Sequence, residues 1–251
     1  MNPIAIIQAR MGSTRLPGKV LMPLAGKPAL EHVIERLGFC ETLSGVVVAT
    51  TTETADDPIV ELCHRLEVPV FRGSEDDVLD RYHHAAAAFD ADPVVRITAD
   101  CPAIDPGVVD IVVGGFFEAE YDLYGLTGEF PDGLDCTVIA RSALDRAWRE
   151  ARLASEREHV GPYLEHHPEL FAIGGVEVFQ GQRHQRWTLD EPEDYRLLTE
   201  IFDELYDSAA PFRAADVIEL LDRRPELAAI NDNVIRNEGY LKSLEDDEVI
   251  Q

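Results

Sequence analysis

The segment that follows the first predicted strand has the residue types needed to bind a chain of phosphates. Residues 8–19 read QARMGSTRLPGK, so cations, glycines and hydroxyl groups occur together over a short stretch. Glycines allow the backbone to approach a phosphate closely, and arginine and lysine neutralise its charge. Residues 1–30 contain no Asp or Glu, although the whole chain has a net charge of −26. We therefore interpret the segment as a polyphosphate-binding loop rather than one that merely crosses an acidic surface, with candidate ligands Gln8, Ala9, Arg10, Gly12, Ser13, Arg15 and Lys19.

Two common nucleotide-binding motifs are absent from this loop. A Walker A loop has four residues between its first glycine and Gly-Lys, and Ser or Thr follows the lysine. Here five residues separate Gly12 from Gly18, and Val20 follows Lys19. The Rossmann pattern G-x-G-x-x-G is also missing. A P-loop NTPase and an NAD-dependent enzyme are therefore disfavoured.

Two carboxylates beyond predicted strands are candidate metal ligands. Asp100 lies just past the predicted strand 94–98, and Asp190 follows the predicted strand 184–189. Transfer from a nucleoside triphosphate needs charge neutralisation, which Mg²⁺ provides when one or two carboxylates and the phosphates hold it. Simpler roles stay open, because Asp100 precedes the turn-forming Cys101-Pro102 and Asp190 could cap a helix.

The elements that must position these side chains follow an α/β pattern. Over the first 120 residues, predicted strands 4–8, 46–49, 68–71 and 94–98 alternate with predicted helices 29–37, 58–66, 78–89 and 105–117. Asp56 and Asp57 are cap candidates for the second helix. This alternation indicates a doubly wound, mostly parallel sheet. Such sheets bind ligands outside the carboxyl ends of their strands, where the loop and Asp100 would both lie.

The second half of the chain is less regular. We expect paired short strands within 121–140, strands over 171–179 and 184–189, and helices over 141–152, 157–166, 192–206 and 214–221. Residues 244–251 form an acidic tail that we expect to be frayed. No internal repeat or linker divides the chain, so we interpret residues 1–251 as a single domain.

Composition excludes several classes of protein. The chain has 251 residues, of which 45% are hydrophobic, enough for one large folded domain. No apolar run approaches the ~20 residues of a membrane span, and the N-terminus lacks the basic region of a signal peptide. The net charge disfavours nucleic acids and anionic membranes as partners. We expect a cytoplasmic protein whose four cysteines are free thiols, since no zinc-binding spacing occurs.

The excess of acidic residues also suggests an environment of high salt. The 48 acidic residues outnumber 22 basic ones, which include 19 Arg and only 3 Lys. Such a surface repels itself in dilute buffer, but at molar salt the Debye length falls to about 3 Å and the repulsion is screened. We therefore hypothesise a halophilic protein.

The loop and several later segments together resemble a known family. The segments are IIQARMGSTRLPGKVLMPLAGKPALEHVIERL, ATTTETADDPIVELC, FRGSEDDVLDRYHHAA, VVRITADCPAIDP, PDGLDCTVI, SEREHVGPYL and RWTLDEPEDY. They are similar to the cytidylyltransferases that activate acidic sugars, the CMP-sialate and CMP-deoxyoctulosonate synthetases, and especially to the spore coat polysaccharide biosynthesis protein F group. The resemblance covers residues 4 to about 206. It implies a GT-A-like fold of the nucleotide-diphospho-sugar transferase superfamily with a small β/α arm, and commonly a homodimer.

The resemblance also implies roles for individual residues. Asp100 and Asp190 match the family's metal-binding acids, although Ala99 stands where relatives often have glycine. Thr50 and Thr51 match a loop that reads the pyrimidine, with solvated threonines at a strand end as the alternative. Arg81 and Arg96 are not explained by helix capping, so either could face the nucleotide. The nucleotide-binding half would then be 1–120, with acceptor binding and dimerisation in 121–251.

An acceptor site is expected in the second half. Segments near the acceptor in the family are matched here by those that contain Asp132, Asp135, Glu158 and His159, of which His159 could contact the sugar or a dimer neighbour. The carboxylate of an acidic sugar needs a cation, for which a bidentate arginine is well suited. The candidate cations are Arg183, His184 and Arg186.

Taken together, these residues predict transfer of CMP from CTP to a sugar hydroxyl, with Mg²⁺ as cofactor and pyrophosphate as the leaving group. The sugar would be an acidic keto-sugar, and the catalytic residues would be Arg10, Lys19, Asp100 and Asp190. Positioning and electrostatic stabilisation would supply most of the catalysis. Two alternatives stay open: a GT-A glycosyltransferase that uses a nucleotide-sugar donor, and a non-catalytic nucleotide-binding partner in the same pathway. The sequence does not decide which sugar is used, nor between cytosine and uracil.

Overall fold

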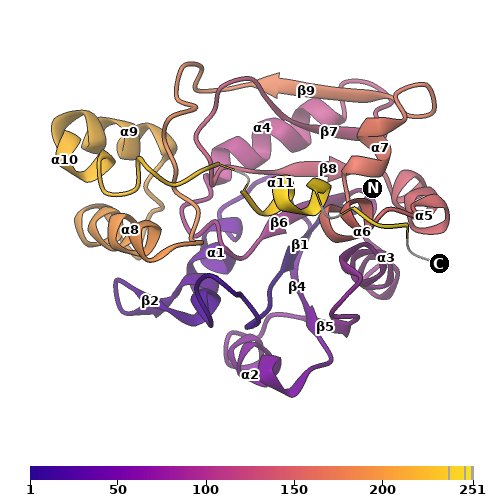
Figure 1. Cartoon of the computed structure of the whole chain (residues 1–251), viewed down its shortest axis with the longest axis horizontal. Helices are drawn as coiled ribbons and strands as arrows, with labels where there is room; N and C mark the ends of the chain where they lie inside the picture. Colours follow the sequence, from indigo (N-terminus) through magenta and orange to yellow (C-terminus); the bar gives the residue numbers. More distant parts are fainter. Residues whose placement is uncertain (237, 246, 250–251) are drawn as a thin grey trace.

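The computed structural model describes residues 1–236, 238–245 and 247–249. Its centre is a seven-stranded sheet with the strand order β5-β4-β1-β6-β8-β7-β9 and helices on both faces (Figure 1). The strands are β1 (Ile4–Gln8), β4 (Gly45–Thr51), β5 (Val70–Gly73), β6 (Val94–Thr98), β7 (Leu123–Thr127), β8 (Thr137–Ile139) and β9 (Ile173–Glu177). β8 is antiparallel to both of its neighbours, and the other pairs in this sheet are parallel. The predicted mainly parallel α/β fold is confirmed.

Both faces of the central strands are buried. In β1, Ala5 and Ile7 pack against one hydrophobic cluster, and Ile4 and Ile6 pack against another. Strands that are buried on both faces have nearly continuous apolar sequences, which explains the run IAII. The first face is covered by α1 (Ala29–Leu37), α2 (Asp57–Arg65) and α4 (Pro106–Phe116), and the second by α3 (Val78–Ala88), α5 (Arg141–Glu150) and α7 (Pro162–His166).

A further group of helices forms a third cluster of apolar side chains beside the sheet (Figure 1). It contains α8 (Pro192–Leu205), α9 (Ala214–Arg223) and α10 (Pro225–Ala228), which pack around Trp187 and Leu189. Leu24 of the hairpin formed by β2 (Pro23–Leu24) and β3 (Lys27–Pro28) joins this cluster. Two further α-helices, α6 (Ala154–His159) and α11 (Glu238–Glu245), contact each other.

The strand register brings the predicted site residues to one edge of the sheet. Gln8, the last residue of β1, pairs with Thr98, the last residue of β6. The segment after Gln8 and the segment with Asp100 therefore leave the sheet side by side. Helix α3 begins at the same edge, where the Asp77 carboxylate accepts a hydrogen bond of 2.8 Å from the backbone of Asp80.

Two predicted elements of the second half are wrong. The predicted helix 157–166 is two short helices, because Val160 has φ = 69° and Gly161 and Pro162 follow it. The predicted strand 184–189 belongs to no sheet, and a single bridge joins Arg186 to Asp132. Its apolar residues are explained by Trp187 and Leu189, which are buried among α8 and α9.

The C-terminal segment also differs from the prediction. Helix α11 was not expected, and residues 247–249 are docked on the start of α6 rather than frayed. The carboxylate of Asp247 accepts hydrogen bonds from the backbone and hydroxyl of Ser155 at 3.0 and 2.8 Å. Residues 246, 250 and 251 of the predicted tail lie outside the described residues. Within the described part of the chain, no helix has the length and hydrophobicity to cross a membrane.

Candidate active site

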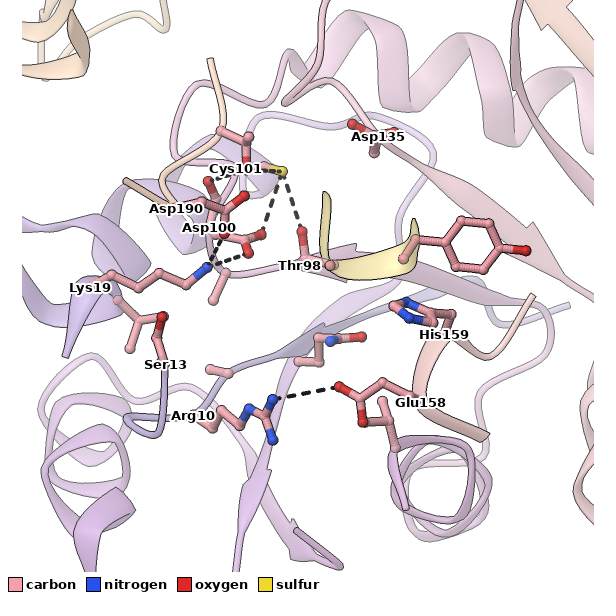
Figure 2. A pocket seen from close by; sticks show the side chains of 18 of the residues that line it. Arg10, Ser13, Lys19, Thr98, Asp100, Cys101, Asp135, Glu158, His159 and Asp190 are labelled. Atoms are coloured by element: carbon pink, nitrogen blue, oxygen red, sulfur yellow. Dashed lines mark hydrogen bonds and ion pairs between the residues drawn. The ribbon is translucent and has the colours of Figure 1, made fainter. Parts of the chain in front are cut away.

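A cavity of about 550 Å³ lies at the carboxyl edge of the sheet (Figure 2). Its walls are the loop after β1, the ends of β1 and β6, the start of α3, and parts of the second half of the chain. The structure brings most of the predicted site residues to this one cavity. They are Gln8, Ala9, Arg10, Gly12, Ser13, Arg15, Lys19, Arg81, Arg96, Asp100, Asp132, Asp135, Glu158, His159, Arg186 and Asp190.

The loop after β1 is folded on itself by backbone hydrogen bonds. The carbonyl of Met11 accepts hydrogen bonds from the backbone N–H groups of Ser13 and Gly18, at 2.9 and 3.1 Å. Gly18 has φ = 72°, a conformation that glycine adopts without strain. The backbone N–H of Met11 donates to Asp56 Oδ1 at 2.7 Å. These contacts fix the loop so that its cations face the cavity.

The carboxylate of Asp56 also binds the hydroxyl groups of Thr50 and Thr51. Their hydroxyls donate to Asp56 Oδ2 at 3.1 and 2.5 Å, and neither residue lines the cavity. The two threonines are 0% and 1% exposed, so they are not solvated, and their hydroxyls bond to Asp56. Sequence reasoning treated Asp56 only as a helix-cap candidate, because its partner Met11 is distant in the sequence.

The ammonium group of Lys19 lies between Asp100 and Asp190 (Figure 2). Its Nζ donates to Asp100 Oδ2 and to Asp190 Oδ1, both at 2.7 Å. Burial alone would lower the pKa of Lys19, but the two carboxylates outweigh burial and raise it. Burial would likewise raise the pKa of Asp100, and Lys19 instead holds it below its usual range. The lysine and Asp100 are therefore both charged at neutral pH.

The two carboxylates fit the requirements of a divalent cation. Because each places an oxygen 2.7 Å from one nitrogen, these oxygens are separated by at most about twice that distance. Mg²⁺ commonly takes one or two protein carboxylates and completes its shell with phosphate oxygens and water. Among residues 1–236, 238–245 and 247–249, no group of three or more His, Cys, Asp or Glu could hold a metal. A metal here would need further ligands from a bound phosphate chain.

Arg15 links the loop to the second half of the chain. Its guanidinium lies 3.1 Å from Asp190 Oδ1 and 3.1 Å from Glu191 Oε1. It also lies 3.4 Å from Glu238 Oε2 in α11. Carboxylates from two segments that are distant in the sequence thus hold this cation at the cavity wall.

Arg186 is buried and already paired, in contrast to the prediction that it binds a sugar carboxylate. Its guanidinium contacts Asp132 Oδ2 at 2.6 Å, Asp190 Oδ2 at 2.7 Å and Asp194 Oδ1 at 3.0 Å. Asp194 in turn accepts hydrogen bonds from the backbone of Asp190 and Glu191 at the start of α8. Arg186 therefore binds three carboxylates of the protein itself, and its position fixes that of Asp190.

Arg183 and His184 lie outside the main cavity. They line a second cavity of about 410 Å³, which among the described residues shares only Asp132 and Arg186 with the first. The structure thus does not bring these two predicted sugar-binding cations to Lys19 and Asp100. The sequence grouped them with Arg186 because all three are cations of the segment GQRHQRW, and of these three Arg186 alone lines the main cavity.

The acceptor candidates Asp132, Asp135, Glu158 and His159 all line the main cavity. Glu158 Oε1 lies 3.5 Å from Arg10 Nη2 (Figure 2), and burial raises the pKa of this glutamate. Burial and Arg96 lower the pKa of His159 to about 4, so its imidazole is neutral at pH 7. Burial, together with Asp135, raises the pKa of Asp132 to about 7.

Helix α11 supplies cavity residues that the sequence did not indicate. Glu238, Gly239, Tyr240 and Ser243 all line the cavity. The helix lies after the last segment of the family resemblance, and no motif in EGYLKSLE distinguishes it from an acidic tail. A local sequence signal for these residues is therefore lacking.

Comparisons with known proteins agree with this geometry. The cytidylyltransferase family model matches residues 4–222. The chain is 38% identical over 242 residues to the uncharacterized protein MJ1063 of Methanocaldococcus jannaschii, covering 96% of this chain and 98% of that protein. It is 33% identical over 236 residues to the spore coat polysaccharide biosynthesis protein SpsF of Bacillus subtilis, covering 91% and 98%.

A solved structure shares the fold over nearly the same length. It is the structure of a cytidylyltransferase from Leptospira borgpetersenii, with a TM-score of 0.86 and 34% identity. The match covers 91% of this chain and 97% of that one. The chain therefore belongs to the cytidylyltransferase family.

Proposed function

We propose that this enzyme transfers CMP from CTP to a hydroxyl of an acidic keto-sugar, with release of pyrophosphate, for surface polysaccharide or glycan biosynthesis. The observation that carries the proposal is the Lys19 ammonium, buried between Asp100 and Asp190 in a loop rich in cations. Family membership supports CTP as the nucleotide, and the similarity to SpsF supports a polysaccharide pathway.

In this proposal the phosphates of CTP lie along the loop after β1. Lys19 and Arg15 neutralise the charge on the phosphate oxygens, and glycine Gly12 lets the backbone approach them. Asp100 and Asp190 would hold Mg²⁺, which supplies charge neutralisation at the phosphates when bound. Arg186 keeps Asp190 in place through its contact of 2.7 Å with Oδ2.

The acceptor sugar would lie between the phosphates and the second half of the chain. Hydroxyl groups of a sugar can donate hydrogen bonds to Glu158 and Asp135, which both line the cavity. Its carboxylate needs a cation other than Arg186. The candidates within the cavity are Arg81 and Arg96, since the buried Nε of each has no hydrogen-bond partner in the described part of the chain.

Pyrophosphate release tests the proposed function. The assay combines the enzyme, Mg²⁺, high salt and each of the four nucleoside triphosphates with a panel of eight- and nine-carbon keto-acid sugars. Release that requires both CTP and one sugar is the expected result. A glycosyltransferase would instead release a nucleotide from a nucleotide-sugar and consume no CTP. Failure of the folded protein to bind any nucleotide would refute the proposal.

A further inference from the structure

Helix α11 forms a wall of the cavity, although it lies beyond the residues that the family model matches. The match ends at residue 222, whereas α11 spans Glu238–Glu245. Figure 1 shows this helix, in yellow, near the middle of the molecule, reached by the chain from α10. The cavity of the candidate active site is therefore incomplete without a segment outside the matched region.

Contacts on both sides hold α11 over the cavity. At its first residue, Glu238 Oε2 lies 3.4 Å from Arg15 Nη1 of the phosphate-binding loop. Further along, Ser243 Oγ lies 3.0 Å from His159 Nε2 of α6. Beyond the helix, Asp247 accepts two hydrogen bonds from Ser155, also in α6. The helix thus bridges the loop that would hold the phosphates and the helix that carries the acceptor candidates.

The hydrogen bonds of α11 determine which ring nitrogen of His159 carries the proton. The hydroxyl of Ser243 donates to the carbonyl of Gly239 at 3.0 Å. A serine hydroxyl has one hydrogen, so Ser243 Oγ accepts from His159 Nε2–H. The neutral imidazole then has its proton on Nε2.

Tyr240 and His159 make an aromatic wall in a cavity that is otherwise mostly polar and charged. Their ring centroids are 5.0 Å apart with an interplanar angle of 84°, an edge-to-face contact. Phosphates gain little from an uncharged aromatic face. A sugar ring, in contrast, presents an apolar C–H face that buries well against an aromatic ring, and hydroxyls at its rim. The carboxylates of Glu158 and Asp135, which also line the cavity, suit those hydroxyls.

We propose that α11 is the acceptor-binding wall of this enzyme, and that Tyr240 determines acceptor specificity by packing its ring on the apolar face of the sugar. The inference rests on the proposed function, because it assumes that a sugar is the acceptor. It adds a substrate-contacting residue beyond residues 4–222, which the family model matches.

The test compares Tyr240→Ala, Tyr240→Phe and wild type in the full-length protein. The probes are 3-deoxy-manno-octulosonate and N-acetylneuraminate, with pyrophosphate release at saturating CTP as the activity readout and calorimetric CTP binding as the second. Tyr240→Ala should raise the KM for the sugar about tenfold, since one aromatic face no longer buries it. Tyr240→Phe keeps the ring and should stay close to wild type. The matched control is Leu241→Ala, because Leu241 on the same helix is 49% exposed and does not line the cavity.

The outcomes separate this inference from the proposed function. An unchanged KM for the sugar in Tyr240→Ala overturns the inference, and so does a tenfold loss of CTP affinity, which would place the ring against the nucleotide. If wild type uses neither sugar, these two acceptors are excluded and the KM comparison moves to the sugar that the panel identifies. The CTP measurement stands by itself: weakened affinity in Tyr240→Ala contradicts the inference.

Discussion

Replacing Arg186 by methionine decides between two roles for this residue, a substrate ligand and a structural clamp. The side chain is 7% exposed and contacts three carboxylates, those of Asp132, Asp190 and Asp194, of which Asp194 is fully buried. Methionine fills a similar volume but leaves these carboxylates without their cation. Removing one partner of a buried ion pair typically costs about 3–5 kcal/mol.

A loss of about 3–5 kcal/mol is a large part of the 5–15 kcal/mol that stabilises a typical folded domain. The assay is urea unfolding in high salt, with the free energy of unfolding obtained by linear extrapolation. Arg186→Lys keeps the charge but loses the planar fork, so it should fall between wild type and methionine. Arg183→Met is the matched control, because Arg183 is exposed in the same segment and should change stability by no more than about 0.5 kcal/mol.

One result would refute the reasoning. Suppose that the free energy of unfolding of Arg186→Met lies within about 1 kcal/mol of wild type, while its KM for the sugar is much higher. The three carboxylates would then not depend on this cation. The guanidinium would then belong to the substrate, as the sequence alone predicted.

Four further predictions follow from the site. Lys19→Ala should lower turnover by about a hundredfold or more with the fold retained by circular dichroism, and wild-type turnover would refute the role of the loop. Asp56→Ala should weaken calorimetric CTP binding about tenfold, since the backbone N–H of Met11 loses its acceptor and the loop loses this anchor. Its control is Asp110→Ala, which removes a similar set of contacts with Thr42 remote from the cavity and should leave CTP affinity intact; equal losses in both variants would contradict the idea. The lowered pKa of His159, about 4 against an ordinary value near 6.5, means that the unfolded chain binds the proton first, so stability falls as pH drops from about 6.5 to 4. His159→Gln should make the free energy of unfolding depend less on pH between about 6.5 and 4, and an unchanged slope would contradict the lowered pKa of His159. Finally, the melting temperature of wild type should rise between about 0.1 and 3 M KCl, and a constant value would remove the halophilic hypothesis.

The sequence predicted the half of the site that depends on strand ends. The loop after β1 and Asp100 both follow buried parallel strands, and the rule that such strands end at one edge places them together. Lys19 could also be predicted, because it lies within residues 1–30, which contain no Asp or Glu although the chain is acidic. Local composition and topology were sufficient there.

The remaining half depends on contacts between distant segments. Arg186 looks like a free cation in the sequence, and only the fold shows that three acids surround it. Asp56 is one acid of a pair near a helix start, and its bond to Met11 spans 45 positions. Helix α11 has no motif, and its place over the cavity depends on contacts with α6 and Arg15. Periodicity and spacing carry no information on such contacts.

The fate of each phosphate of CTP tests the central claim most directly. Wild-type enzyme is incubated with Mg²⁺, the keto-acid sugar panel, and CTP labelled at either the α- or the γ-phosphorus. We predict that the α-label moves to a nucleotide-sugar and the γ-label to pyrophosphate, in equal amounts, that Asp100→Asn abolishes both transfers, and that Lys19→Ala slows both strongly. Bound CTP whose labels stay in CTP, or appear only as CDP and orthophosphate, would contradict the assignment of this site to nucleotidyl transfer.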